Sequence, residues 1–140
     1  LANHVLYYVT DLDTVVPAIV RALAPGGVFQ TAIAGHDNPL IRFWVSAFAL
    51  LGRPVPYQTA ESVAATFARQ AIVVTTSTVP YRLEFPDTPA NRASILRFLL
   101  GEYFAMLPQD ALLSFFDPYA RAGAIVIETC SHHFVVTAAG

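Results

Sequence analysis

The sequence predicts an α/β fold built around two neighbouring parallel strands. Leu1–Tyr7 and Val28–Ala34 are apolar runs of strand length, and the segment between them has the period of an amphipathic helix. The apolar residues on one face of that helix are Val16, Ile19, Val20 and Leu23. Pro25-Gly26-Gly27 follows the helix with residues that favour a tight turn. Two apolar strands joined by one helix form a parallel crossover unit, and this arrangement indicates the fold class.

The start of the first helix is set by a proline. Asp11 and Asp13 are both residue types that commonly cap helices. Pro17 has no backbone N–H and fits best in the first turn, where N–H groups lack helical partners. We therefore expect the helix to begin at Asp13 or Thr14 rather than at Asp11.

A second helix is expected over residues 40–51, with Gly52 at its end. Asp37 or Asn38 would cap it, and Pro39 would lie in its first turn. Its residues are apolar on nearly every side, which is typical of a helix that is buried all round. Two interpretations stay open: an ordinary buried helix, or a cap over a substrate pocket.

Three further helices are predicted from their first residues. Thr59 would cap one whose first turn and buried side contain Glu61, Val63 and Phe67. Thr88 and Pro89 form an N-cap followed by proline at the first helical position. After an interruption at 107–108, Asp110 would cap a helix that Gly123 ends.

Four strands are expected in the second half of the chain, over residues 71–79, 81–85, 124–127 and 134–137. Pro80 would end regular pairing or mark a bulge between the first two. The polar residues 130–132 would form a turn between the last two.

The first 35 residues resemble a known enzyme family. The stretch LANHVLYYVTDLDTVVPAIVRALAPGGVFQTAIAG is similar to the middle of class I S-adenosylmethionine-dependent methyltransferases of the small-molecule type, from the fourth to the fifth strand. Tyr8 stands where many relatives have histidine. The resemblance implies the C-terminal half of a Rossmann-like methyltransferase sheet, with parallel strands, an antiparallel last strand between the fifth and sixth, and a helical insertion.

The same resemblance divides the chain into parts, given as residues 1–35 (strand-helix-strand core), 36–56 (cap helix and linker), 57–87 (helix and strand), 88–123 (helical insertion) and 124–140 (C-terminal strands). It also implies that the Gly-rich turn of the first strand and the acidic residue of the second, which bind the cofactor, are missing. We therefore expect a fragment that is inactive alone and whose first strand offers an open edge for self-association.

Candidate site residues follow the carboxyl ends of the first two strands, where ligands of open α/β sheets bind. By resemblance, Asn3 and His4 contact the cofactor S-adenosyl-L-methionine. His4 and His36 are the candidate bases, because imidazole titrates near neutrality. The candidate substrate-binding residues are Tyr8, Asp37 and Trp44. Structural roles stay open as alternatives: packing or capping for His4, helix capping for His36 and Asp37, and the core for Trp44.

Composition excludes several function classes. The net charge is −2, with eight arginines, no lysine and ten acidic residues, so no basic patch for nucleic acid is expected. No apolar run is long enough to cross a membrane. A single cysteine, Cys130, fits the cytoplasm and is expected to be an inert thiol. Neighbouring side chains on a strand point to opposite faces, so no metal site is expected at His132 and His133.

The sequence is therefore consistent with two functions. The first is a fragment of a methyltransferase that methylates a small molecule. The second is a non-catalytic half-domain or binding module, which either pairs with a separate chain through its open edge or binds an apolar ligand beneath the helix at 40–51. The substrate, the methylated atom and the oligomeric state stay open.

Overall fold

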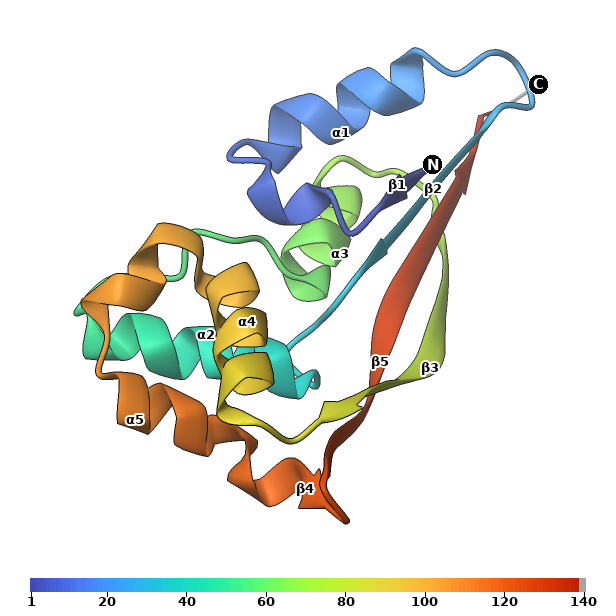
Figure 1. Cartoon of the computed structure of the whole chain (residues 1–140). Coiled ribbons are helices and arrows are strands. Elements are labelled where there is room, and N and C mark those ends of the chain that lie inside the picture. The colour runs from blue at the N-terminus through green and yellow to red at the C-terminus, as the bar shows by residue number, and fades with distance from the viewer. Residues whose placement is uncertain (139–140) are drawn as a thin grey trace. The chain divides into compact units, whose positions relative to one another are not determined.

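A computed structural model describes residues 1–138 (Figure 1). These residues belong to two units. Unit 1 contains residues 1–38, 56–80 and 130–138. Unit 2 contains residues 39–55 and 81–129. The chain thus crosses between the units four times, and the strands β3 (Thr75–Pro86) and β5 (Ala124–Thr137) each contribute residues to both.

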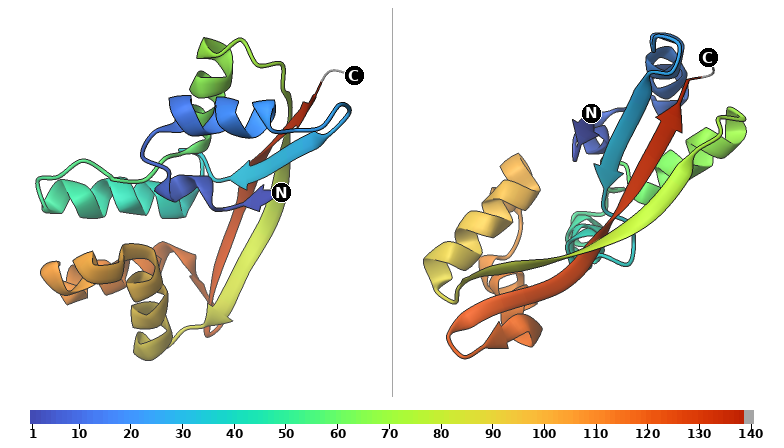
Figure 2. Two further views of the ribbon diagram at one scale, coloured as in Figure 1. Left: turned by 90° about the horizontal axis from the view of Figure 1, so that it is seen from above. Right: turned by 90° about the vertical axis from the view of Figure 1, so that its right-hand side faces the viewer.

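The sheet is mixed, with strand order β1-β2-β5-β3 (Figure 2). β1 (Ala2–Asn3) pairs in parallel with β2 (Val28–Ile33), with Ala2 opposite Thr31. β5 runs antiparallel to β2 and lies between β2 and β3. The α/β class is confirmed, and β5 has the place and direction that the resemblance gives to the last strand. A mostly parallel sheet is not confirmed, because among the described pairings only β1 and β2 are parallel.

The first strand is shorter than predicted. β1 ends at Asn3, His4 has a left-handed backbone (φ 53°), and Leu6–Tyr8 form a turn of 3₁₀ helix. This turn buries Leu6 and Tyr7, which an extended chain of alternating residues would point to opposite faces. The expected strand Leu1–Tyr7 is therefore wrong beyond Asn3.

Helix α1 (Leu12–Arg21) is capped by Asp11, whose side chain accepts a hydrogen bond from the backbone N–H of Thr14 at 3.0 Å. The expected start at Asp13 or Thr14 is wrong. Pro17 lies inside the helix, which tolerates it with one fewer backbone hydrogen bond. Leu12 and Val16 form the buried side.

Helix α3 (Ala60–Arg69) follows the sequence prediction. Glu61 lies in its first turn, and Val63 and Phe67 are buried. Thr59 stands at the N-cap position as predicted, but its side chain makes no capping hydrogen bond, so the expected cap is confirmed in position only. The Phe67 ring lies 5.6 Å from that of Phe134 on β5, measured between ring centroids. α3 therefore packs against the sheet within unit 1.

Unit 2 is mostly helical. Its elements are α2 (Pro39–Leu50), α4 (Pro89–Leu100), the 3₁₀ helix Gly101–Met106, α5 (Gln109–Leu113), the 3₁₀ helix Ser114–Tyr119 and the short strand β4 (Ala120–Arg121), which pairs with β5. α2 is not buried on every side, since Val45 is 50% exposed while Ile41, Phe43 and Phe48 are buried.

The starts of α4 and α5 and the end of α5 can be compared with the capping predictions. Thr88 caps α4 as expected and accepts a hydrogen bond from the N–H of Asn91 at 3.2 Å. Asp110 does not cap the next helix, because α5 has Pro108 as its N-cap residue and Asp110 lies in its first turn. This helix also does not continue to Gly123, since a 3₁₀ segment replaces it after Leu113.

The two longest strands are continuous where breaks were expected. β3 runs through Pro80 for 12 residues, and most of its side chains are exposed. β5 runs for 14 residues through 130–132, so the expected turn there is wrong. The reason is tertiary: His132 lies opposite Ile33 of β2, and this pairing outweighs the local preference of a polar run for a turn.

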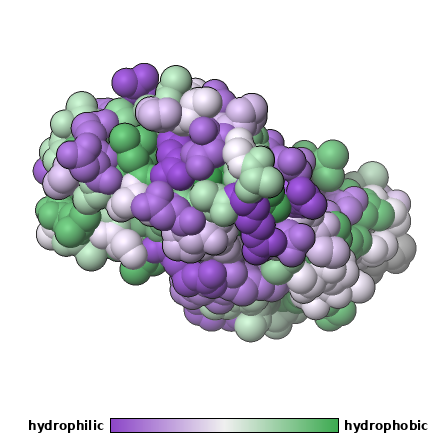
Figure 3. All heavy atoms as spheres, turned by 60° about the horizontal axis from the view of Figure 1, so that its bottom comes forward, coloured by the Kyte–Doolittle hydropathy of each residue, from purple (hydrophilic) through white to green (hydrophobic). Residues whose placement is uncertain are grey.

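The described surface mixes polar and apolar residues. On the face drawn in Figure 3, hydrophilic and hydrophobic side chains are interspersed. Within residues 1–138, the helices are all too short or too polar to pass through a lipid bilayer.

Candidate active site

The carboxyl ends of β1 and β2 lie at the same edge of the sheet, because these strands are parallel and Asn3 is opposite Ala32. Residues 4–8 follow β1 and residues 34–38 follow β2. Most of the side chains singled out from the sequence belong to these two loops. All of them lie in unit 1, except Trp44.

His4 makes three contacts at this edge of the sheet. Its backbone N–H donates to the carbonyl of Ala32 at 2.8 Å, and its Nδ1 lies 3.1 Å from the hydroxyl of Tyr7. The two rings are stacked, with centroids 5.8 Å apart. The pKa of His4 is lowered, first because the ring loses part of its hydration and then because His133 lies near it. The ring is therefore favoured in its neutral form near pH 7, which a general base requires.

The tautomer of His4 decides whether it can act as a base. If Nδ1 carries the hydrogen, it donates to the Tyr7 oxygen, and Nε2 is left to accept a proton. If Nε2 carries the hydrogen, Nδ1 accepts from Tyr7 and the ring can only donate through Nε2. The geometry with Tyr7 admits both.

Tyr7 connects the two loops and was not singled out from the sequence. Its hydroxyl oxygen accepts a hydrogen bond from the backbone N–H of Ala34 at 2.8 Å, and the residue is 8% exposed. The signal available in the sequence was the pair Tyr7-Tyr8, of which only Tyr8 was expected at the site. Tyr8 is 65% exposed, and its ring meets that of Tyr57 edge to face at 5.6 Å.

His36 has an acidic neighbour that sequence reasoning also missed. Its backbone N–H donates to Glu61 Oε1 at 2.8 Å, and its Nδ1 lies 3.7 Å from Glu61 Oε2. The pKa of Glu61 is lowered: desolvation, the largest single effect, opposes the shift, but the hydrogen bond from the backbone N–H of His36 together with smaller effects of the nearby groups outweighs it. An imidazole beside a carboxylate that can orient it is a common arrangement of a general base.

Asp37 lies among side chains of β5 rather than beside His36. Its carboxylate accepts from the thiol of Cys130 at 3.1 Å, and both its oxygens lie 3.1 Å from Nε2 of His132. Desolvation is the largest effect on the pKa of Asp37 and raises it, but the hydrogen bonds from Cys130 and His132 together lower it. The hydrogen bond to Asp37, followed by desolvation, raises the pKa of Cys130. The thiol is thus favoured in its protonated form near pH 7, and the expectation of an inert cysteine stays a prediction.

Trp44 belongs to unit 2 and has the packing role that was weighed as its alternative. It is 5% exposed, and its indole N–H donates to the carbonyl of Leu99 at 2.9 Å. A substrate-binding role for Trp44 stays a prediction.

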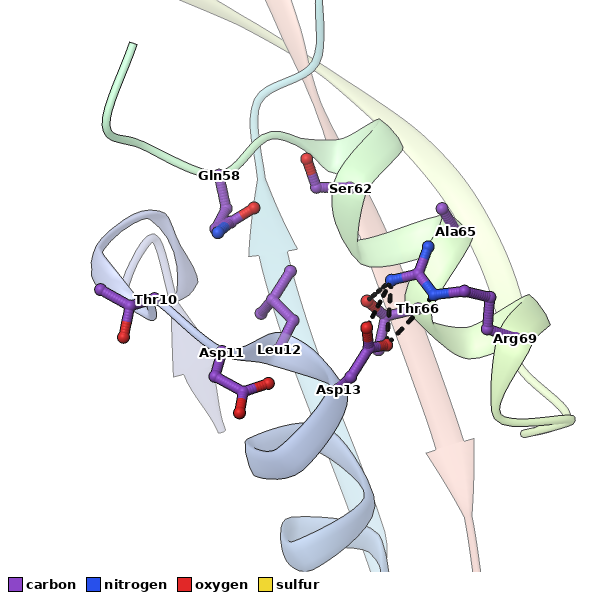
Figure 4. A pocket seen from close by; sticks show the side chains of 9 residues that line it. All are labelled: Thr10, Asp11, Leu12, Asp13, Gln58, Ser62, Ala65, Thr66 and Arg69. Atoms are coloured by element: carbon purple, nitrogen blue, oxygen red, sulfur yellow. Dashed lines mark hydrogen bonds and ion pairs between the residues drawn. The ribbon is translucent and has the colours of Figure 1, made fainter. Parts of the chain in front are cut away.

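A polar pocket of about 410 Å³ lies beside the start of α1 (Figure 4). It is lined by Thr10, Asp11, Leu12, Asp13, Gln58, Ser62, Ala65, Thr66 and Arg69. The guanidinium of Arg69 points at Asp13, to which it donates at 2.9–3.2 Å, and also reaches Thr66. Gln58 joins the pocket to the segment that follows β1. Its backbone N–H donates to the carbonyl of Tyr7, and its side-chain amide donates to the carbonyl of Val9.

Comparisons with known proteins identify no family for this chain. No protein-family model matches the chain, and no curated protein matches it in sequence.

Proposed function

We propose that this chain supplies the C-terminal half of a class I S-adenosylmethionine-dependent methyltransferase that acts on a small molecule in the cytoplasm. The observation that carries the proposal is the sheet order, in which an antiparallel C-terminal strand separates β2 from β3. Strands that follow each other in the sequence, such as β2 and β3, are more often direct neighbours in a sheet. The observed order is the less common one, and it is the order that the resemblance in residues 1–35 implies.

The loop after β1 supports the assignment of the cofactor side. Asn3 and His4 stand at the carboxyl end of β1, where α/β proteins bind their ligands. His4 is held from its backbone by Ala32 and from its ring by Tyr7. A residue held on both sides in a left-handed conformation has a fixed position, which suits the alignment of a cofactor.

Methyl transfer needs little covalent chemistry from the protein. The nucleophile attacks the methyl carbon in line with the departing sulfur, so the protein chiefly aligns the two reactants and excludes water. A base is required only when the nucleophile holds its proton at neutral pH. In that case His36 is the better-placed candidate, since its ring has a carboxylate, that of Glu61, 3.7 Å from Nδ1, which stabilises the protonated ring that forms when the base accepts a proton.

The test is calorimetric titration of S-adenosylmethionine and S-adenosylhomocysteine into two proteins. One is this chain, and the other is this chain joined to any residues that its gene encodes before it. If those residues contain a Gly-rich strand-turn-helix, the longer protein is expected to bind one cofactor and the 140 residues alone none. Asn3→Ala should weaken binding to the longer protein, while Val73→Ala, at a position 90% exposed in the same unit, should not.

Two results would count against the proposal. A longer protein with the Gly-rich turn that bound neither compound would contradict it outright. Tight binding by the 140 residues alone would show that the Gly-rich turn is not needed here.

A second candidate function is a half-domain that pairs with a separate chain. The observation that favours it is the position of β1 at one end of the strand order, where its second edge is open to another strand. Size-exclusion chromatography with light scattering checks it. Self-association or capture of a strand-bearing partner is expected, whereas a monomer at all concentrations would argue against an active edge.

A further inference from the structure

Three side chains of different chemistry meet where β2 ends. The ligand atoms of Asp37, Cys130 and His132 all lie within 4.8 Å of one another. The thiol and the imidazole both contact the carboxylate at 3.1 Å. A thiolate, an imidazole and a carboxylate are the three kinds of ligand that zinc takes in proteins.

The backbone explains why these residues converge. Cys130 and His132 are two apart on β5, so their side chains share one face of the strand. The residues between and after them face the other way, where the hydroxyl of Ser131 lies 3.0 Å from Nε2 of His133. Since His132 is opposite Ile33, the loop that follows β2 runs past this face and brings Asp37 to it.

The loop is fixed in that position. The buried Asn38 donates through its side chain to the carbonyl of Cys130 at 3.3 Å, and its backbone N–H donates to the carbonyl of Gly35 at 3.0 Å. Asp37 is thus tied through its neighbour to the strand that carries the other two side chains. Preorganised ligands lose less entropy on binding a metal.

The spacing of the ligand atoms also suits zinc. Tetrahedral zinc with bonds of about 2.0–2.3 Å places its ligand atoms about 3.5 Å apart. The two separations of 3.1 Å from the carboxylate need to grow by a few tenths of an ångström. The cluster as a whole extends to 4.8 Å between ligand atoms, so its most distant pair has to approach by about 1 Å when the metal binds.

One of the three side chains, His132, also lines a pocket. A hollow of about 240 Å³ is lined by Ala60, Glu61, Ala64, Thr76, His132 and Phe134. Gly35 helps to keep room beside the ring, because a Cβ there would lie 3.0 Å from His132 Nε2 and 2.7 Å from Glu61 Oε1. A metal with three protein ligands would have its fourth position available for water or a small ligand.

We propose that Asp37, Cys130 and His132 form a zinc-binding site. On binding, Cys130 loses its thiol proton to solvent and bonds the metal as thiolate, and Asp37 binds through one oxygen. Nε2 of His132, which donates a hydrogen to Asp37 in the metal-free chain, gives that hydrogen up to solvent while Nδ1 carries one, so the neutral ring binds the metal through the freed Nε2 lone pair. Glu61 lines the same pocket as His132. The site does not depend on the proposed methyltransferase function.

The experiment is titration of the metal-free, reduced 140-residue chain with Zn²⁺ in competition with a chromogenic chelator. One zinc per chain is expected, with a Kd of about 1 μM or lower. Cys130→Ser, His132→Ala and Asp37→Asn should each weaken binding, the first two by at least about 100-fold. His133→Ala is the matched control: it removes the adjacent imidazole on the opposite face and should leave the Kd unchanged.

Cobalt supplies a readout that folding defects do not mimic. The chain loaded with Co²⁺ should show a thiolate-to-metal charge-transfer band and the intense visible bands of a tetrahedral site. Cys130→Ser should lose the charge-transfer band, and circular dichroism should show that this variant remains folded. The proposal is overturned if no stoichiometric binding occurs, or if binding survives Cys130→Ser and His132→Ala or is lost equally in His133→Ala.

Discussion

The hydroxyl of Tyr7 and the backbone N–H of Ala34 form a buried hydrogen bond of 2.8 Å that ties the loop after β1 to the end of β2. It joins residues 27 positions apart and fixes the ring against which His4 is stacked. This phenolic oxygen therefore holds the candidate cofactor loop in place together with the backbone hydrogen bonds of His4 to Ala32 and of Gln58 to Tyr7.

Tyr7→Phe removes that oxygen and leaves a buried N–H without its acceptor. We expect a loss of about 1–3 kcal/mol in the free energy of unfolding, because an unsatisfied buried donor costs that much. Urea denaturation measures it. The matched control is Tyr8→Phe, at an exposed ring, which should change stability by less than about 0.5 kcal/mol. Equal stability of wild type and Tyr7→Phe would show that the hydrogen bond contributes nothing.

His4→Gly separates a structural role of His4 from a functional one. Glycine adopts the left-handed backbone of this position without strain, which offsets the loss of the exposed contact with Tyr7. Stability in thermal unfolding should stay within about 1 kcal/mol of wild type. Cofactor binding by the longer protein, measured by calorimetry, should fall if the imidazole contacts the cofactor. Unchanged binding would leave His4 with a packing role only.

Arg92 makes the stability of unit 2 sensitive to acid. Its guanidinium donates to Asp87 and Asp117, each at 2.6 Å, and to the carbonyl of Leu113 at 2.9 Å. The hydrogen bond to Arg92 lowers the pKa of Asp87 below its ordinary value of 3.8. Because the folded-state pKa is the lower one, this stabilisation is present above pH 3.8 and is lost as the pH falls through the folded-state value.

Asp87→Asn should therefore flatten the loss of stability below about pH 4, relative to wild type, in denaturation curves recorded at several pH values. Glu102→Gln, at an exposed acid of the same unit, serves as the control and should keep the wild-type slope. A wild-type slope in Asp87→Asn would mean that another group governs the acid response.

Trp44→Phe tests the core role of the single tryptophan. The change leaves the carbonyl of Leu99 without the indole donor and removes buried ring atoms, so stability should fall by about 1–3 kcal/mol. In the wild type, the emission of Trp44 should shift to longer wavelength only when unit 2 unfolds. Quenching of the native emission by a candidate substrate would instead favour the substrate-binding interpretation.

Local structure, such as helix caps and the extent of a strand, could be predicted from the sequence, and the pairing of residues far apart in the chain could not. The cap at Thr88, the first turn of α3 and the extent of β2 follow from residues within a few positions of one another, and all three are confirmed. The turn at 130–132 was wrong because a polar run carries no sign of the strand that pairs with it. The carboxylate of Asp37 meets the thiol of Cys130 across 93 residues, and nothing in either neighbourhood of the sequence indicates this meeting.

Because β2 pairs with residues 132–137, its antiparallel partner is synthesised about 100 residues after it. At a translation rate of 5–20 residues per second, the emerging chain holds this strand without that partner for about 5–20 s. The apolar residues that β2 later buries, Phe29, Ala32 and Ile33, are accessible to chaperones and to neighbouring nascent chains during that time. We therefore expect the speed of the ribosome and the supply of chaperones to influence how much of this protein reaches its folded state.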